Sequence, residues 1–196
     1  MRKIKYVLLI CVMIFAITAC GNKEEDVVID ETEVVENTEE KPSEESADTK
    51  PVTIFGVFDS QTLEGEKVTE DIFANADLTM VNIWGTFCGP CIAEMPDLGE
   101  ISREYADKGF QIVGMICDVM EPGDETAIEI VEETKADYTH LIASEDLTMN
   151  ALQYVSSVPT TVFVDKEGYV VGEIYSGARD KTTWELIINQ YLAEVK

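Results

Sequence analysis

The feature that most constrains the fold is an apolar segment followed by two cysteines three positions apart. Residues 80–84 carry four apolar side chains, and Cys88 and Cys91 come shortly after them. Pro90 suits the first turn of a helix, because the N–H that proline lacks has no intrahelical partner there. The pattern therefore predicts a strand that delivers Cys88 to a helix start, where unpaired backbone N–H groups favour negative charge.

Two cysteines at this spacing can form a redox pair, a structural disulfide or half of a zinc site. A helix N-terminus lowers the pKa of the first cysteine, and the thiolate is the form that attacks disulfides. We predict that Cys88 is the nucleophile and that Cys91, one turn further along, resolves the mixed disulfide. Zinc needs about four ligands, and Cys117 and the single histidine, His140, make a poor set. We therefore expect a redox-active Cys88–Cys91 disulfide, with no metal and no other cofactor.

The N-terminus has the pattern of an export signal. Residues 1–19 begin with basic side chains, continue with an apolar run and end in small residues. The run is shorter than the roughly 20 residues that span a membrane. The segment from Ile17 to Cys20 (ITAC) resembles a bacterial lipobox, which implies lipidation of Cys20; a plain secretory signal or a retained anchor is the alternative. We expect a lipid anchor at Cys20, on the extracytoplasmic face of a bacterial membrane.

The chain is strongly acidic, with a formal net charge of −25. Nucleic acid is therefore excluded as a partner, because binding it requires clustered cations. Residues 24–50 carry many carboxylates and no aromatic residue, so they cannot bury enough apolar surface to order themselves. We predict a lipidated cysteine and disordered acidic linker over residues 20–50, with a cation-binding or partner-docking tail as the alternative.

Residues 51–196 alternate between strand and helix patterns, which predicts an α/β domain with a mixed sheet. The expected strands are 53–58 and 67–69, which form a hairpin, then 78–84, 110–117, 140–143, 162–164 and 169–175. The expected helical segments are 70–74, 90–108, 124–135, 146–154 and a terminal helix from 180.

The segment 51–196 resembles the TlpA/ResA family of membrane-tethered, thioredoxin-like thiol–disulfide oxidoreductases. The matching residues are 81–91 (VNIWGTFCGPC), Glu94, Pro96, 158–161 (VPTT) and 164–168 (VDKEG). The resemblance implies a thioredoxin-like fold, in which helices flank a central mixed sheet, here with an N-terminal β-hairpin extension. It also implies a cis peptide before Pro159, opposite the cysteines; the sequence alone leaves cis and trans equally open.

Glu94 is the predicted acid–base group of the site. It lies three residues beyond Cys91, so a helix makes their side chains neighbours. In the family a glutamate here is linked to thiol acidity and substrate choice, whereas thioredoxin uses an aspartate on the preceding strand. This chain has Asn82 at that strand position, and an amide cannot take a proton. We predict that Glu94 accepts the Cys91 proton, with a solvated glutamate on the helix surface as the alternative.

The residues around the pair and Pro159 predict a substrate groove. The expected groove residues are Trp84, Phe87, Gly89, Pro90 and Val158. For Trp84, packing in the core or in the wall of the site is expected as well. Phe87 stands where the family commonly has tryptophan, and Gly89-Pro90 matches thioredoxin, which favours a reducing role. Cys117 is expected to be a small buried hydrophobe, with a third redox cysteine as the alternative. His140 is expected to be a surface or packing residue.

These features predict an extracytoplasmic disulfide reductase of envelope proteins, with apocytochrome c or methionine sulfoxide reductase as substrate. The resemblance also implies a membrane electron donor of the CcdA/DsbD type. A disulfide-forming oxidase is the rival enzyme, and an acidic surface lipoprotein that binds a partner without catalysis is the rival of another class. A peroxidase is disfavoured, because peroxide reduction needs an isolated activated cysteine in a different local pattern.

Overall fold

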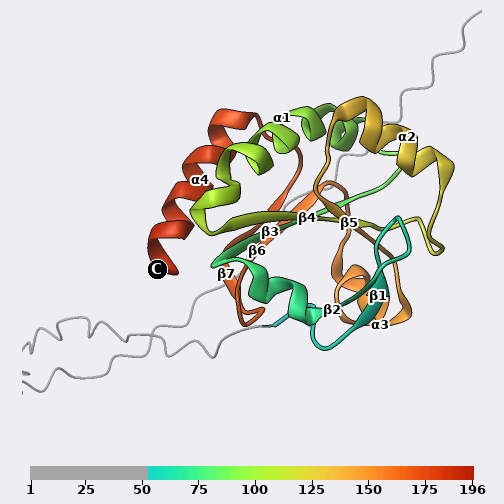
Figure 1. Ribbon diagram of the computed structural model, residues 1–196, viewed down its shortest axis with the longest axis horizontal. Coiled ribbons are helices and arrows are strands. Elements are labelled where there is room, and N and C mark those ends of the chain that lie inside the picture. The colour runs from blue at the N-terminus through green and yellow to red at the C-terminus, as the bar shows by residue number, and fades with distance from the viewer. Residues whose placement is uncertain (1–52) are drawn as a thin grey trace, which may run out of the picture. The chain divides into compact units, whose positions relative to one another are not determined.

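The computed structural model describes residues 53–196, which fold around a five-stranded sheet (Figure 1). The predicted export signal (1–19) and the lipidated linker (20–50) lie outside the described residues. Across residues 53–196, every helix is too short or too polar to cross a membrane.

The sheet has the strand order β5-β4-β3-β6-β7. Its strands are β3 (Leu78–Trp84), β4 (Phe110–Ile116), β5 (Thr139–Ile142), β6 (Thr160–Asp165) and β7 (Val170–Ser176). β3, β4 and β5 run parallel, whereas β6 is antiparallel to β3 and β7 is antiparallel to β6. The predicted mixed sheet is therefore confirmed.

A separate antiparallel hairpin precedes this sheet, as predicted, but its first strand is shifted. It consists of β1 (Asp59–Gln61) and β2 (Lys67–Thr69). The strand predicted at 53–58 is wrong, because Phe55 and Phe58 instead bury their rings against Phe73. The β-branched and aromatic residues of segment 53–58 therefore contribute to side-chain packing and not to strand pairing.

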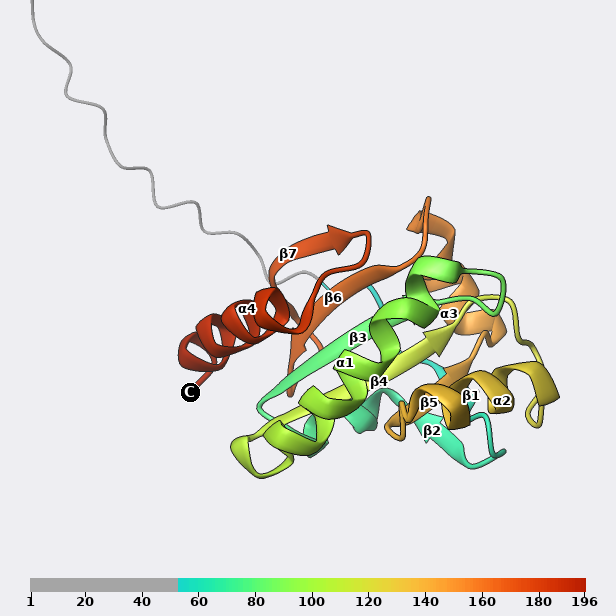
Figure 2. The same ribbon diagram turned by 90° about the horizontal axis from the view of Figure 1, so that it is seen from above.

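Helices cover the two faces of the sheet unequally (Figures 1 and 2). One face carries α1 (Gly89–Tyr105), α2 (Glu125–Thr134) and α4 (Lys181–Glu194). The other carries the hairpin, the 3-10 helix η1 (Glu70–Asn75) and α3 (Glu145–Asn150). The short 3-10 turns η2 (Ala106–Lys108) and η3 (Leu152–Tyr154) follow α1 and α3; the helix predicted at 146–154 is thus two elements.

The side chains of β3 alternate between these two faces, and all seven residues are buried. Met80 and Trp84 pack with residues of α1 and α4, whereas Val81 and Ile83 pack with residues of η1 and α3. Asn82 shares the parity of Met80 and Trp84. The strand therefore directs this one amide toward α1.

Local signals set the helix ends. Cys88 caps α1, which continues through Pro96 and, after η2, stops at Gly109 in the left-handed conformation with φ 77°. Asp124 caps α2 and Asp180 caps α4, each by accepting a hydrogen bond from the backbone three residues on. These predicted starts and the predicted stop are confirmed.

Candidate active site

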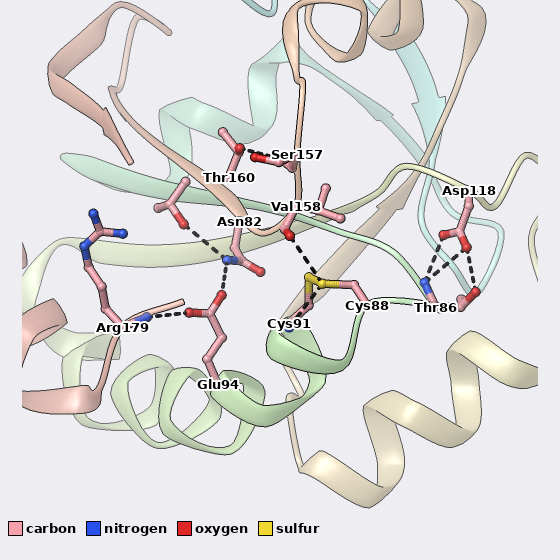
Figure 3. Close-up of a disulfide and its surroundings, with 11 residues drawn as sticks. Asn82, Thr86, Cys88, Cys91, Glu94, Asp118, Ser157, Val158, Thr160 and Arg179 are labelled. Carbon is pink, nitrogen blue, oxygen red and sulfur yellow. Dashed lines mark hydrogen bonds between the residues drawn. A yellow bond between two sulfur atoms is a disulfide. The ribbon is translucent and has the colours of Figure 1, made fainter. Parts of the chain in front are cut away.

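Cys88 and Cys91 form a disulfide at the N-terminus of α1 (Figure 3). Cys88 Sγ accepts a hydrogen bond from the backbone N–H of Cys91 at 3.2 Å. The first N–H groups of a helix have no intrahelical acceptor, so a Cys88 thiolate gains both this hydrogen bond and the positive end of the helix dipole. Cys88 is 5% exposed and Cys91 is fully buried. Of the two sulfurs, only that of Cys88 is therefore open to a partner.

The segment before β6 crosses the disulfide at close range. The Val158–Pro159 peptide bond is cis, which confirms the expectation drawn from the family. Val158 O lies 3.5 Å from Cys88 Sγ (Figure 3). Pro159 is buried, and its carbonyl accepts a hydrogen bond from the N–H of Gly177, which follows β7, at 2.8 Å. The chain around Pro159 is thus tied to the sheet while Val158 faces the sulfur.

A pocket of about 520 Å³ opens beside Cys88. Its lining comes from the start of α1, the residue after β4, η3 and the segment between η3 and β6. The residues are Phe87, Cys88, Gly89, Pro90, Cys117, Leu152, Val155, Ser156, Ser157 and Val158. Phe87 is 72% exposed, so its ring is available to a partner at the pocket. Four of the five predicted groove residues therefore line one cavity next to the reactive sulfur.

Trp84 is the one predicted groove residue that does not line this pocket, and it packs in the core instead. Its side chain is fully buried on the α1 face of β3, and its indole Nε1–H donates to Nδ1 of His140 at 3.2 Å. Because Nδ1 is the acceptor, Nε2 carries the proton and donates to Ala136 O at 2.8 Å. Burial lowers the pKa of His140 to about 4. Trp84 and His140 are therefore core residues, as the packing interpretation of His140 expected.

Glu94 is buried beside the disulfide, so the alternative of a solvated glutamate is wrong. Its Oε1 accepts from Asn82 Nδ2 at 3.0 Å, and its Oε2 accepts from the backbone N–H of Arg179 at 3.1 Å. Burial raises the pKa of Glu94, and the hydrogen bonds from Asn82 and Arg179 partly oppose that rise. A carboxyl with a raised pKa exchanges protons closer to neutral pH, as a general base for a thiol requires.

Two residues at the end of β4 also belong to this region. Cys117 is half-buried and lines the pocket, so it is less buried than the small buried hydrophobe that the sequence predicted. Burial, together with the charge of Asp118, raises the pKa of the Cys117 thiol. Asp118 accepts hydrogen bonds from the N–H of Thr86 at 3.1 Å and from its hydroxyl at 2.6 Å, which fixes the loop before Cys88.

Sequence reasoning missed the role of Asp118, although a signal existed. Parallel strands end at the same edge of a sheet, and Trp84 pairs with Ile116 in register. The residues directly after β3 and β4 must therefore meet. Within the part of the chain that the structure describes, no three His, Cys, Asp or Glu side chains gather in a way that would hold a metal ion.

The fold and this site together define a thioredoxin-like thiol–disulfide oxidoreductase. Residues 47–184 match the Redoxin family, and the chain belongs to it, in the TlpA/ResA-like group. The chain is 33% identical over 129 residues to the thioredoxin-like protein YneN of Bacillus subtilis (strain 168). These residues cover 65% of this chain and 72% of YneN. It is 33% identical over 115 residues to the thiol-disulfide oxidoreductase ResA of Bacillus cereus (strain ZK / E33L), covering 57% of this chain but only 62% of ResA.

Solved structures agree on the fold. A thiol:disulfide interchange protein from Chlorobium tepidum TLS superposes with a TM-score of 0.62 at 23% identity, over 74% of this chain and 99% of the other. StoA from Bacillus subtilis superposes with a TM-score of 0.54 at 18% identity, over 69% and 98%. At these identities the likeness establishes architecture alone.

Proposed function

We propose that this oxidoreductase works as a disulfide reductase on extracytoplasmic proteins, with Cys88 as the attacking sulfur. One observation carries the assignment of Cys88: its sulfur caps α1, lines the pocket and lies 3.5 Å from Val158 O. Cys91 is fully buried and cannot meet a protein substrate. The direction of electron flow is supported by Gly89-Pro90 between the cysteines, the dipeptide of thioredoxin.

The reaction consists of two exchanges at sulfur. In the reduced enzyme the Cys88 thiolate attacks a substrate disulfide; one S–S bond forms as another breaks, and one substrate sulfur leaves as a thiolate. Cys91 then gives its proton to Glu94 and attacks Cys88 Sγ. The second substrate sulfur leaves, so two electrons pass to the substrate and the Cys88–Cys91 disulfide remains. The proton on Glu94 passes on to solvent or to the departing thiolate.

Substrate recognition is assigned to the segment before β6, at Val158, and to the pocket. An extended substrate segment can pair with the backbone beside Val158, and Pro159 contributes no competing N–H. Phe87 and the lining of the pocket then receive an apolar side chain next to the substrate cysteine. Gly89 and Pro90 carry no bulky polar group at the rim, which leaves Cys88 accessible from this side.

The wider setting is proposed from the sequence. A lipid on Cys20 would hold the domain at the outer face of a bacterial membrane, at the end of the acidic linker. A membrane donor of the CcdA/DsbD type would reduce Cys88–Cys91 again. Apocytochromes c, whose Cys-X-X-Cys-His segments must be reduced, and oxidised methionine sulfoxide reductase are the proposed substrate classes.

Trapping tests the function directly. Cys91→Ser should accumulate mixed disulfides through Cys88 in cells, and mass spectrometry of the trapped partners identifies the substrates. With Cys117→Ser introduced in both proteins, the matched control Cys88→Ser should trap none, because Cys91, the sulfur that remains in the described domain, is fully buried. If Cys91→Ser captured no more protein than Cys88→Ser, and the unmodified protein failed to reduce insulin disulfides, the non-catalytic alternative would replace the reductase. A domain found mainly oxidised in cells, with a strongly oxidising potential, would instead favour the disulfide-forming oxidase.

A further inference from the structure

The buried amide of Asn82 carries an unused acceptor beside the redox pair. Asn82 is fully buried on β3, and its Nδ2 donates to Glu94 Oε1 at 3.0 Å and to Thr161 Oγ1 at 3.2 Å. Both amide hydrogens are therefore taken. Its Oδ1 has no hydrogen-bond partner in the described chain. A buried acceptor without a donor destabilises the folded state, so a native protein is expected to make use of it.

The amide oxygen is turned toward the cysteines. Asn82 and Glu94 are hydrogen-bonded, and Glu94 lies one helical turn beyond Cys91 on the same face of α1. Figure 3 shows the amide nitrogen directed to Glu94 and the amide oxygen directed to the side of the disulfide. In the disulfide state Cys91 Sγ carries no hydrogen and cannot donate to Oδ1.

We propose that Asn82 Oδ1 accepts a hydrogen bond from the Cys91 thiol whenever the disulfide is open. This inference rests on the redox function proposed above and adds a residue to it. Opening the disulfide, in the mixed disulfide or in the reduced enzyme, gives Cys91 an S–H group, and the acceptor that the disulfide leaves empty is then filled. One side chain thereby holds both the proton donor, Cys91, and the proton acceptor, Glu94.

The arrangement has two consequences. The hydrogen bond stabilises the thiol of Cys91, so that the proton leaves only when Glu94 takes it. It also stabilises the dithiol state relative to the disulfide state, in which Oδ1 is unpaired. The charged groups around this amide are Glu94 on α1 and Arg179 after β7, whose guanidinium stacks over Tyr175 and Trp184. The effect of Asn82 must therefore be separated from the charge of Glu94.

The test measures the pKa of Cys91 in a Cys88→Ser, Cys117→Ser protein, where Cys91 is the one thiol of the folded domain. The thiolate is followed by ultraviolet absorbance against pH. Asn82→Leu, similar in size but without an acceptor, should increase the acid dissociation constant of Cys91 about tenfold. The comparison is repeated with Glu94→Gln, which removes the carboxylate charge and should leave the direction of the change intact.

Thr161→Val is the matched control, because it removes the other partner of the Asn82 amide and leaves Oδ1 in place. It should change the pKa of Cys91 far less than Asn82→Leu. An equal effect of Thr161→Val would mean that general disturbance of the site is responsible, and the proposal would fall. A rise in the pKa of Cys91 in Asn82→Leu would overturn it too, since the amide would then be donating N–H to the thiolate.

Two further measurements keep the proposal open to refutation. With Cys88 and Cys117 intact, Asn82→Leu should shift the dithiol/disulfide equilibrium about tenfold toward the disulfide, a potential about 30 mV more negative. If Asn82→Leu does not fold, infrared spectra of the Cys88→Ser, Cys117→Ser protein decide the matter. The Cys91 S–H stretching band should lie at the lower frequency of a hydrogen-bonded thiol, and a band at the free-thiol position would contradict the proposal. Neither the pKa nor the infrared measurement depends on enzymatic activity, so failure of the reductase function would be seen separately.

Discussion

Mild acid should destabilise this domain through His140, the single histidine of the chain. Its ring is 1% exposed, and both nitrogens are engaged, with Nδ1 accepting from Trp84 and Nε2 donating to Ala136 O. A Cβ added to Gly114 would lie 2.1 Å from Nδ1, so the ring is also tightly enclosed. Protonation at Nδ1 would replace an acceptor by a donor that faces the Trp84 N–H. The folded state therefore disfavours protonation of His140, and its pKa is lowered.

The size of the effect follows from the two pKa values of His140. The pKa is about 4 in the folded chain, lowered by burial, against 6.5 in the unfolded chain. The unfolded state binds the proton first, so this contribution to stability is intact above pH 6.5 and is lost as the pH falls toward 4. Linkage gives a loss of about 2 kcal/mol between pH 7 and pH 5, and about 3 kcal/mol once both states are protonated.

Urea unfolding of the unmodified protein and of His140→Phe at pH 7, 6 and 5 tests this prediction. Many carboxylates also titrate below pH 5, so the quantity that counts is the difference between the two pH profiles. His140→Phe should be less stable at pH 7, because Trp84 loses its acceptor, yet it should lose about 2 kcal/mol less than the unmodified protein on going to pH 5. Parallel pH profiles, or an imidazole that titrates near pH 6.5 by NMR in the folded state, would refute the reasoning.

Three further changes probe packing, binding and proton transfer. Gly99→Ala places a Cβ 2.3 Å from the carbonyl oxygen of Lys135, so urea unfolding should show a loss of about 1–3 kcal/mol. Phe87→Ala removes a ring that is 72% exposed, so stability should change by less than about 0.5 kcal/mol while KM for a protein disulfide rises; an unchanged KM would remove Phe87 from the groove. Glu94→Gln should slow the resolution of the mixed disulfide about 100-fold, and stopped-flow measurements should show that this step no longer depends on pH in the range where Glu94 ionises.

The strand β3 and the helix α1 were predictable because each carries a local sequence signal. The apolar run over 78–84 became β3 with the same bounds, since a strand buried on both faces needs no alternation of polar residues. Pro90 and Gly109 mark the start and the stop of the helix that follows. The first hairpin strand was misplaced because Phe55 and Phe58 satisfy a strand pattern and a packing pattern equally well.

The site was predictable residue by residue, but its contacts were not. Glu94 follows from helical spacing to Cys91, whereas its partners Asn82 and Arg179 lie 12 and 85 positions away and meet it only in the folded chain. Trp84 was expected to contribute either to the groove or to core packing, and the sequence does not separate the two. Trp84 points to the same face of β3 as Met80, and on that face it is buried in the core. Tertiary packing decides which face of β3 is covered by α1.

Glu94 and His140 have opposite effects on the pH dependence of stability, and this separates stability from catalysis. The pKa of Glu94 is raised by burial, so its contribution to stability is complete below the unfolded pKa of 4.5 and is lost as the pH rises through its folded pKa. His140 acts in the reverse sense: its pKa is lowered by burial, so its contribution to stability is lost as the pH falls. Catalysis needs the ionised form of Glu94, which is the form that burial disfavours. Acidification should therefore remove activity through Glu94 while stability is lost through His140, and Glu94→Gln should abolish the first dependence without altering the second.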